Sequence, residues 1–236
     1  MKQKNKNEIV KLEIDAQKHL IQPWPYAGSI GDELREIISS GDGIFVKDKN
    51  GNKLIDGPAG MWCTNLGHRN KDIAKVMYEQ AIELSYNSPW YTSNAPSAEL
   101  STKIANYAPG DLNHVFFTTG GSTAVESSLR FTHFYNNARG RPEKKLIVCR
   151  EDGYHGSTYL SSSLNGKSRT SDWMDYAHEM IIRLSSPNPF RRKKSMSEED
   201  FENFLISELE TAIKEKGSNN IAAFIGEPIL ASGGVI

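Results

Sequence analysis

The chain has 236 residues, of which 38% are hydrophobic and 24% charged, and its formal net charge is -1. These values are typical of a soluble globular protein with one large or two small domains. They argue against a nucleic-acid or anionic-membrane partner, which would favour a basic surface. No apolar run approaches the ~20 residues of a membrane-spanning helix, and no apolar stretch follows the basic first residues, so we expect no secretory signal.

The first hundred residues predict three helices and one hairpin. Apolar residues recur at three- and four-residue steps over 7–20, 70–84 and 97–107, which is typical of amphipathic helices. The segment GIFVKDKNGNKLIDG (43–57) contains two short alternating runs that meet at Asn50-Gly51, a pair typical of a tight turn. We therefore expect a β-hairpin there.

From residue 114 onward, apolar runs alternate with helical patterns. We expect strands at HVFFT (114–118), KLIVC (145–149), EMIIRL (179–184) and IAAFIG (221–226). Helices are expected over 122–138, 157–164 and 197–215, the last with a capped start at Ser197 and Asp200. This order predicts βαβ units and a mainly parallel sheet with helices on both faces. The basic segment SSPNPFRRKKS (185–195) is expected to be a mobile, solvated loop.

The two cysteines, Cys63 and Cys149, are far apart and match no metal-binding or redox spacing. We therefore expect a reduced, cytoplasmic setting and no metal site. Cys149 ends an apolar run, so it is expected to lie in the core rather than to react.

The stretch TTGGSTAVESSLRF (118–131) joins a predicted strand to a predicted helix through Gly120, Gly121 and Ser122. A first helical turn has free N–H groups and the positive end of the helix dipole, and glycine lets a ligand approach the backbone, so this junction suits an anion. Its spacing is neither that of a Walker loop nor that of a dinucleotide fingerprint. The alternative is a tight turn that Ser122 caps with nothing bound.

Two further segments follow predicted strands, at the sheet edge where α/β proteins bind ligands. DGYHGST (152–158) sets Tyr154 and His155 between glycines, and FIGEPILASGG (224–234) sets Glu227 at the end of the last strand. The ring of Tyr154 can lie flat on a heterocycle. In the alternative interpretation, Tyr154 is an ordinary half-buried tyrosine, His155 has a structural role and Glu227 caps a neighbouring loop.

Together these segments resemble the class III pyridoxal-phosphate-dependent aminotransferases, and within that family the amine– or omega-amino-acid–pyruvate transaminases. Five blocks carry the resemblance, which extends from about Trp24 to Ile236: GIFVKDKNGNKLIDGPAGMWCTNLGH, YNSPWY, TTGGSTAVESSLRF, REDGYHGSTYLSSSL and AAFIGEPILASGGVI. The resemblance implies the α/β fold of PLP-dependent transferases, fold type I. It implies that residues 1–65 belong to the small domain and residues 66–236 to the first part of the large cofactor-binding domain, incomplete at the C-terminus.

The resemblance also implies site roles. Residues 120–122 would hold the phosphate of pyridoxal 5'-phosphate, Tyr154 would stack on the pyridine ring with His155 beside it, and Glu227 would lie near the cofactor. Trp62 and Trp90 would line the substrate pocket, in agreement with the apolar pocket that large rings form. Family members are homodimers with the site at the subunit interface, so a homodimer is expected.

Two blocks depart from the family's usual pattern. Many members have Gly-Ser-Glu-Ala where this chain has GSTA (121–124), and the usual Gln-Gly-Ala-Gly-Gly is replaced by LASGG (230–234). These departures leave the amino donor open. The family's pyridine-binding aspartate and Schiff-base lysine would follow the last residue of this chain, so we expect a truncated chain that is inactive alone. None of the chain's own candidate lysines has an apolar setting: Lys144, Lys145, Lys167, Lys193 and Lys194.

Three functions remain open on the sequence. The first is an aminotransferase that moves an amino group from an amine or omega-amino acid to pyruvate or another 2-oxo acid, which the Met-Trp-Cys run (61–63) favours. The second is an aminomutase or decarboxylating relative with the same phosphate site. The third is a non-catalytic fragment that binds phosphate compounds or pairs with another chain.

Overall fold

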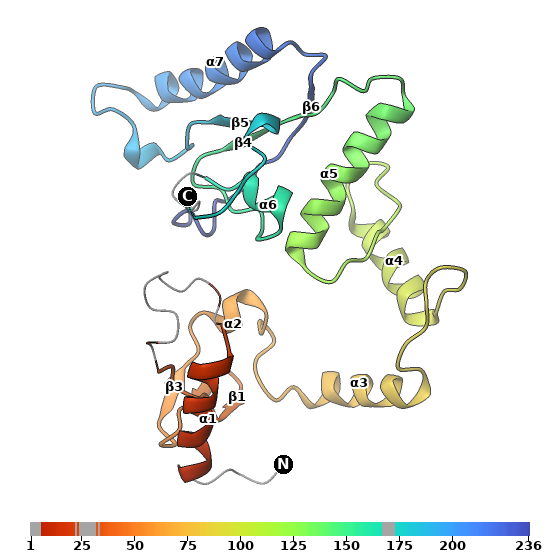
Figure 1. Cartoon of the computed structure of the whole chain (residues 1–236), viewed down its shortest axis with the longest axis vertical. Helices are drawn as coiled ribbons and strands as arrows, with labels where there is room; N and C mark the ends of the chain where they lie inside the picture. Colours follow the sequence, from red (N-terminus) through yellow and green to blue (C-terminus); the bar gives the residue numbers. More distant parts are fainter. Residues whose placement is uncertain (1–5, 22, 24–31, 33, 167–172) are drawn as a thin grey trace. The chain divides into compact units, whose positions relative to one another are not determined.

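The computed structural model describes residues 6–21, 23, 32, 34–166 and 173–236, and Figure 1 shows the elements along the chain. It divides the chain into two compact units, residues 1–100 and 101–236. A domain division at residue 65 stays a prediction, and Trp24 and Lys167 lie outside the described residues. No helix among the described residues is long and apolar enough to cross a membrane.

The first unit begins with a helix and a small antiparallel sheet. Helix α1 (Lys6–His19) agrees with the helix predicted over 7–20. Strands β2 (Phe45–Lys47) and β3 (Lys53–Ile55) form the predicted hairpin, and β1 (Ser40–Asp42) pairs with the other edge of β2. The alternating pattern found the hairpin, whereas the short β1 run carried too few residues to signal a strand.

A buried carboxylate organises the hairpin turn. Oδ1 of Asp48 accepts hydrogen bonds from the backbone N–H groups of Asn50 and Asn52, both at 2.8 Å, and Oδ2 accepts one from the Asn52 amide at 2.7 Å. Burial raises the pKa of Asp48, but these hydrogen bonds outweigh it and hold the pKa below its usual value. In the same turn, Lys49 Nζ donates to both oxygens of Glu13 at 2.9 and 3.1 Å, which fastens α1 to the hairpin.

A left-handed turn carries Trp62. All four residues of the element labelled α2 (Ala59–Trp62) have positive φ, from 49° to 67°. This conformation costs a non-glycine residue about 1–2 kcal/mol, so neighbouring groups must hold it. The Asp56 carboxylate accepts hydrogen bonds from the N–H groups of the turn's first two residues and contacts Nε2 of His68 at 2.9 Å. The His68 bond holds the pKa of Asp56 below its usual value, against the effect of burial.

Two helices follow, as predicted over 70–84 and 97–107. Helix α3 (Lys71–Glu83) starts at Asn70, whose side chain accepts a hydrogen bond from the Ile73 N–H at 3.1 Å. Helix α4 (Ala95–Tyr107) contains the boundary between the two units. Neither helix has a fully buried residue. Local capping and periodicity therefore determine where these helices form.

The second unit is built on a parallel sheet. Its strands are β4 (Leu146–Arg150), β5 (Ile181–Leu184) and β6 (Ile221–Phe224), in the order β5-β4-β6. Both neighbouring pairs are parallel, which confirms the predicted sheet type. Central β4 is the most buried strand because it has a neighbour on each side and helices above and below.

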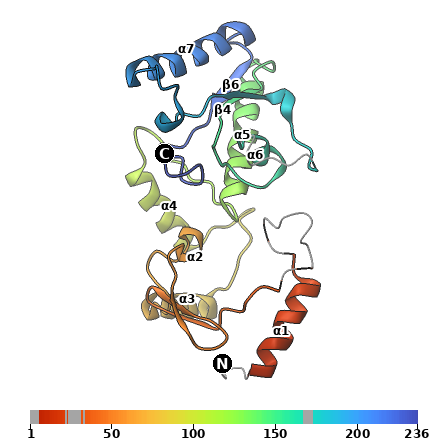
Figure 2. The same ribbon diagram turned by 90° about the vertical axis from the view of Figure 1, so that its left-hand side faces the viewer.

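Helices cover both faces of this sheet, as predicted. Helices α5 (Gly121–Ala138) and α6 (Tyr159–Ser163) lie on one side and α7 (Glu198–Lys216) on the other, as Figures 1 and 2 show. The core between the sheet and α5 contains Leu129, Ile147 and Cys149. Burial raises the pKa of the Cys149 thiol to about 11, so this cysteine is a core residue.

The strand predicted over 114–118 is wrong, since this segment forms neither helix nor strand. A strand needs a neighbour for its ladder hydrogen bonds, and among the described residues the sheet of this unit contains β5, β4 and β6 alone. The apolar run is instead half-exposed: Phe116 is 65% exposed, and its ring packs edge-on against Phe131 of α5 with centroids 5.2 Å apart.

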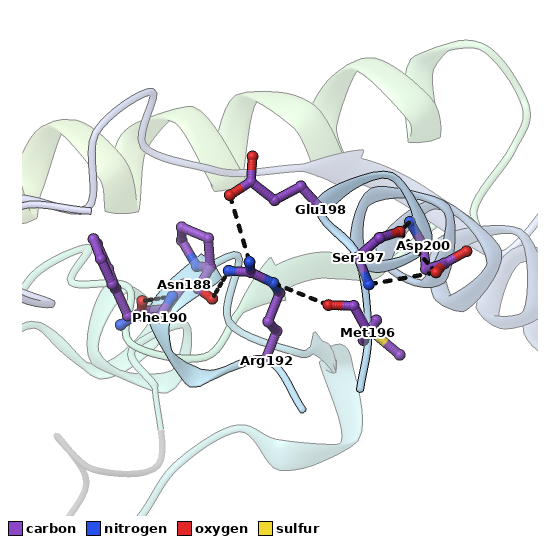
Figure 3. Close-up of polar contacts among 8 residues, drawn as sticks. Asn188, Phe190, Arg192, Met196, Ser197, Glu198 and Asp200 are labelled. Atoms are coloured by element: carbon purple, nitrogen blue, oxygen red, sulfur yellow. Dashed lines mark hydrogen bonds and ion pairs between the residues drawn. The ribbon is translucent and has the colours of Figure 1, made fainter. Parts of the chain in front are cut away.

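The segment expected to be a solvated loop is partly structured. It contains a short 3-10 turn, η4 (Pro189–Arg191), and Arg192 closes it, as Figure 3 shows. The Arg192 guanidinium donates to the carbonyl oxygens of Pro189 at 2.7 Å and Met196 at 3.1 Å, and it lies 3.5 Å from the Glu198 carboxylate. Arg192 therefore stabilises the loop through its contacts. The run of basic residues in the sequence did not predict this role, because it shows the charge of the segment and not the partners of its side chains.

The capped start of α7 is confirmed. Ser197 Oγ accepts a hydrogen bond from the Asp200 N–H at 3.0 Å and donates to Asp200 Oδ2 at 2.7 Å (Figure 3). The α5 and α6 helices predicted over 122–138 and 157–164 are confirmed as well, within two residues at each end. The strand predicted over 179–184 begins at Ile181, because its first residues belong to a 3-10 turn, η3 (His178–Met180).

Candidate functional site

The loops that follow β4 and β6 meet at one edge of the sheet. The two strands are parallel neighbours, so their carboxyl ends lie side by side. Tyr154 lies in the loop after β4 and Glu227 in the loop after β6. The backbone N–H of Tyr154 donates to Oε1 of Glu227 at 2.8 Å. The sheet therefore brings together two residues that the sequence singled out separately.

The N-terminus of α5 lies at the same place. Ser122, the second residue of the helix, accepts a hydrogen bond from the Ser157 N–H at 3.0 Å through Oγ. A serine hydroxyl has one donor and two acceptor positions, so the Ser122 O–H proton is left for a further partner. Among the described residues, the N–H groups of Gly121 and Ser122 donate no hydrogen bond. A Cβ added at Gly120 or Gly121 would meet open space, which leaves room for a ligand there.

In the loop between β4 and α6, distant side chains form hydrogen bonds with the backbone of residues 154–157. The N–H of Tyr154 donates to Glu227, that of His155 to Asn165 Oδ1 at 2.6 Å and that of Ser157 to Ser122. Asn165 also donates through Nδ2 to the carbonyl oxygen of Gly156 at 2.9 Å. Since buried backbone groups need partners, this network fixes the path of a loop that has no regular structure.

The side chain of Tyr154 folds back onto the same loop. Its hydroxyl lies 2.9 Å from Ser157 Oγ, and the residue is half-buried. Gly156, two residues on, has a φ of 141° and lies so close to two elements that an added Cβ would be 2.3 Å from Ser161 Oγ and 2.9 Å from Ser122 Cα. Only glycine allows the loop to approach α5 and α6 this closely.

His155 is buried behind the loop, with 8% of its surface exposed. Burial lowers the pKa of its imidazole, and the nearby Glu227 carboxylate opposes this shift only in part. The ring is therefore neutral near pH 7. A neutral, buried ring suits a packing and orienting role better than that of a cation facing a phosphate.

The predicted pocket residues lie in the other unit. Trp62 is 60% exposed at the end of the left-handed turn, and Trp90 is 81% exposed in the segment between α3 and α4. Their role in a substrate pocket stays a prediction. Of the lysines considered above, Lys144 donates to the carbonyl oxygen of Ile221 and Lys145 to the Asn137 side chain. Both lie near the amino ends of strands, at the opposite edge of the sheet from Tyr154.

Several residues of this site were missed from the sequence. Glu126 of α5 accepts hydrogen bonds from the α6 N-terminus, and Asn165, 4% exposed, holds the loop from behind. The one available signal was the spacing of Glu126, which is four residues after Ser122 and therefore on the same helix face. Asn165 gave no signal, because its partners are backbone groups of a distant loop.

Comparisons with known proteins identify the family of the chain. The sequence profile of the family described as Aminotransferase class-III matches residues 29–236. The chain is 38% identical over 210 residues to a diaminobutyrate–2-oxoglutarate transaminase of Halomonas elongata, covering 87% of this chain and 45% of that protein. It is 35% identical over 222 residues to a putrescine–pyruvate aminotransferase of Pseudomonas aeruginosa, covering 94% and 49%.

Solved structures give the same result. The omega transaminase of Pseudomonas jessenii in complex with PMP matches with a TM-score of 0.90 and 34% identity, over 95% of this chain and 50% of that one. An (S)-enantioselective omega-transaminase of Thermomicrobium roseum matches with a TM-score of 0.90 and 30% identity, over 96% and 51%. The chain thus spans about half the length of these relatives. On the extent of the profile match and the shared fold, the chain belongs to the class III aminotransferases and has the fold of PLP-dependent transferases.

Proposed function

We propose that this chain forms the phosphate- and ring-binding part of an aminotransferase that moves an amino group from an amine or omega-amino acid to pyruvate or another 2-oxo acid. One observation carries the proposal: the free amides of α5, the Ser122 hydroxyl and the Tyr154 loop meet at the carboxyl edge of the sheet. Relatives named as putrescine–pyruvate and diaminobutyrate–2-oxoglutarate transaminases support amine donors and 2-oxo acid acceptors.

The residues present fit pyridoxal 5'-phosphate. The N–H groups of Gly121 and Ser122 and the hydroxyl of Ser122 are donors, and the positive end of the α5 dipole favours a phosphate dianion. The open space beside Gly120 and Gly121 lets oxygen atoms reach the amides. When bound, the coenzyme supplies an electron-withdrawing ring for the bonds of the substrate amine.

The chain's own groups then act by binding and orienting. Amides at 121 and 122 hold the phosphate, and the Ser157 N–H, bound to Ser122 Oγ, turns the serine proton toward it. Tyr154 covers one face of the ring and shields it from water. Glu227 fixes Tyr154 through its backbone N–H and adds a carboxylate at the same edge. We further propose that Trp62 and Trp90 contribute the apolar wall of the substrate pocket and that the protein is a homodimer.

A proline substitution tests the phosphate site directly. Gly121 is the first residue of α5, where proline is well tolerated, and Gly120 before it is extended (φ 174°, ψ 172°), as a residue before proline must be. Gly121→Pro therefore removes one N–H and leaves the helix intact. We expect it to weaken pyridoxal 5'-phosphate binding roughly tenfold in equilibrium dialysis, since a hydrogen bond to a charged group contributes ~1.5–3 kcal/mol.

The matched control is Gly121→Ala, which keeps the N–H and meets open space. Binding of pyridoxal, which has no phosphate, should be equal in all three proteins. Equal affinity of the unsubstituted chain for the two vitamers would contradict the proposal. For the reaction itself, the coding sequence is read beyond codon 236, the encoded protein is purified, and alanine formation from pyruvate is measured with a panel of amines. No alanine from any donor would count against the proposed reaction.

A further inference from the structure

Glu126 accepts three hydrogen bonds from a second element through one carboxylate oxygen. Oε2 of Glu126 lies 2.6 Å from the hydroxyl of Thr158 and 3.2 Å from the backbone N–H groups of both Leu160 and Ser161. Glu126 belongs to α5, and the three donors belong to the N-cap residue Thr158 and the first turn of α6. A single side chain therefore joins the two helices on this side of the sheet.

A carboxylate suits this position for two reasons. The first N–H groups of a helix have no partner within the helix, and the positive end of the dipole attracts a negative charge. Within α6, the Thr158 N–H donates to Ser161 Oγ at 3.1 Å. The N–H groups of Leu160 and Ser161 donate to Glu126. An apolar or basic residue at 126 would remove this acceptor from both N–H groups.

Glu126 works together with Ser122, one helical turn earlier on the same face of α5. Ser122 Oγ accepts the Ser157 N–H at 3.0 Å, and Glu126 accepts the hydroxyl of the next residue, Thr158. Two neighbouring positions of α5 therefore hold two consecutive residues of the loop. The Tyr154 hydroxyl, in turn, lies 2.9 Å from Ser157 Oγ. The contacts from Glu126 to Tyr154 therefore lead from α5 through Thr158 and Ser157 to the Tyr154 hydroxyl.

We propose that Glu126 is a positioning residue that sets the distance between the α5 amides and the Tyr154 ring, so that one ligand can contact both. This inference rests on the proposed function, because the ligand considered is pyridoxal 5'-phosphate. Glu126 itself does not touch the ligand. It acts by docking α6 and residues 157–158 against α5, and it thereby fixes the end of the loop opposite to the Glu227 contact.

The test compares Glu126→Ala, Glu126→Gln and the control Ser128→Ala. Ser128 is exposed on α5, and within the described part of the chain its hydroxyl donates to the Val125 carbonyl of its own helix and to no other group. Equilibrium dialysis with pyridoxal 5'-phosphate should give an affinity roughly tenfold lower for Glu126→Ala, equivalent to about 1.4 kcal/mol. The loss should be about threefold for Glu126→Gln, whose carbonyl oxygen still accepts hydrogen bonds. Ser128→Ala should bind as the unsubstituted chain does.

Amide hydrogen exchange separates positioning from general stability. In Glu126→Ala, the amides of Ser157, Leu160 and Ser161 should exchange faster, while those of central strand β4 should keep their protection. Loss of protection at these three amides with unchanged coenzyme affinity would overturn the inference. If the unsubstituted chain binds no pyridoxal 5'-phosphate, the proposed function fails instead, and the exchange data still report the α5–α6 contact.

A double-mutant cycle covers the case in which Glu126→Ala does not fold. Thr158→Val keeps the side-chain shape and removes the hydroxyl that Glu126 binds. Glu126→Gln and Thr158→Val should each weaken coenzyme binding, and the double variant should lose less than the product of the two single effects. Strictly multiplicative effects would show that the two groups act independently and would refute the inference.

Discussion

Tyr154 and Glu227 are 73 residues apart in the chain, yet the backbone N–H of the first donates to the carboxylate of the second at 2.8 Å. The contact crosses from the loop after β4 to the loop after β6, two parallel neighbours in the sheet. It involves the main chain of Tyr154, whose side-chain hydroxyl lies 2.9 Å from Ser157 Oγ of the same loop. The geometry of the sheet edge therefore determines where the Tyr154 loop lies, and three of the predictions below concern its surroundings.

Glu227→Ala should release the Tyr154 loop. The variant leaves the Tyr154 N–H without its acceptor, and a hydrogen bond to a charged group contributes about 1.5–3 kcal/mol. We expect faster hydrogen exchange at the Tyr154 amide and roughly tenfold weaker binding of pyridoxal 5'-phosphate. Glu227→Gln keeps a carbonyl acceptor and should lose less. Glu215→Ala, at an exposed position of α7, serves as the control, and identical exchange rates in Glu227→Ala and this control would rule the contact out.

His155 should make the stability of the chain fall as the pH is lowered. Burial holds the pKa of the folded-state imidazole below the 6.5 of an unperturbed histidine. Below pH 6.5 the unfolded state therefore binds more protons than the folded state, so the free energy of unfolding decreases with decreasing pH until the folded-state pKa is passed. Urea unfolding at a series of pH values should show this slope.

The slope should be smaller in His155→Gln, which removes the buried imidazole. Because Glu227 raises the pKa of His155, Glu227→Gln should lower the His155 pKa further when it is followed by NMR. A His155 pKa above 6.5 would contradict the burial seen in the structure.

Gly156→Ala should destabilise the second unit and weaken coenzyme binding together. The added methyl group would lie 2.3 Å from Ser161 Oγ and 2.9 Å from Ser122 Cα, and the φ of 141° is strained for any other residue. Overpacking of this kind costs about 1–3 kcal/mol. Thermal melting provides the measurement, with Gly57→Ala as the control because no atom of the described residues lies within 4 Å of its added Cβ. An unchanged melting temperature in Gly156→Ala would show that the loop does not pack as described.

Asp56→Asn should loosen the left-handed turn that carries Trp62. The carboxylate binds the first two N–H groups of that turn and His68, and an amide is a weaker acceptor for all three. We expect faster hydrogen exchange at Cys63 and Thr64, whose N–H groups bond to the carbonyl of Ala59 at 3.0 and 2.9 Å. Asp42→Asn, an exposed change in the same small sheet, should leave these rates unaltered.

The same variant should change the acid dependence of stability. The pKa of Asp56 is lower in the folded state than its usual value of 3.8, chiefly through the His68 bond. Its contribution to stability is therefore complete above about pH 4 and is lost as the pH falls through the folded-state pKa. The free energy of unfolding, measured at pH values from neutral to acidic, should depend less steeply on pH in Asp56→Asn. The same pH dependence of the free energy of unfolding in both proteins would mean that the Asp56 carboxylate does not bind His68 as described.

The sequence by itself determined the local elements and the order of the motifs. Periodicity placed α3 and α7, the Asn50-Gly51 pair placed the hairpin, and alternating strands and helices predicted the parallel sheet. These features depend on residues close together in the chain, because capping, turn conformation and side-chain spacing are local. Local pattern also produced the error at 114–118, since a strand depends on a partner that the run itself does not contain.

Only the tertiary structure decided which motifs meet. Three sets of hydrogen bonds join residues up to 73 positions apart: Glu227 to Tyr154, Asn165 to His155, and Glu126 to the start of α6. Most of the partners are backbone groups, which every residue type has, so the sequence does not mark them. His155 is neutral near pH 7 because the folded chain buries its imidazole, which lowers its pKa. The left-handed backbone conformation of Trp62 is likewise a feature of the folded chain. Such features follow from how distant segments pack, because hydrogen-bond partners and solvent exposure exist only once the chain has folded.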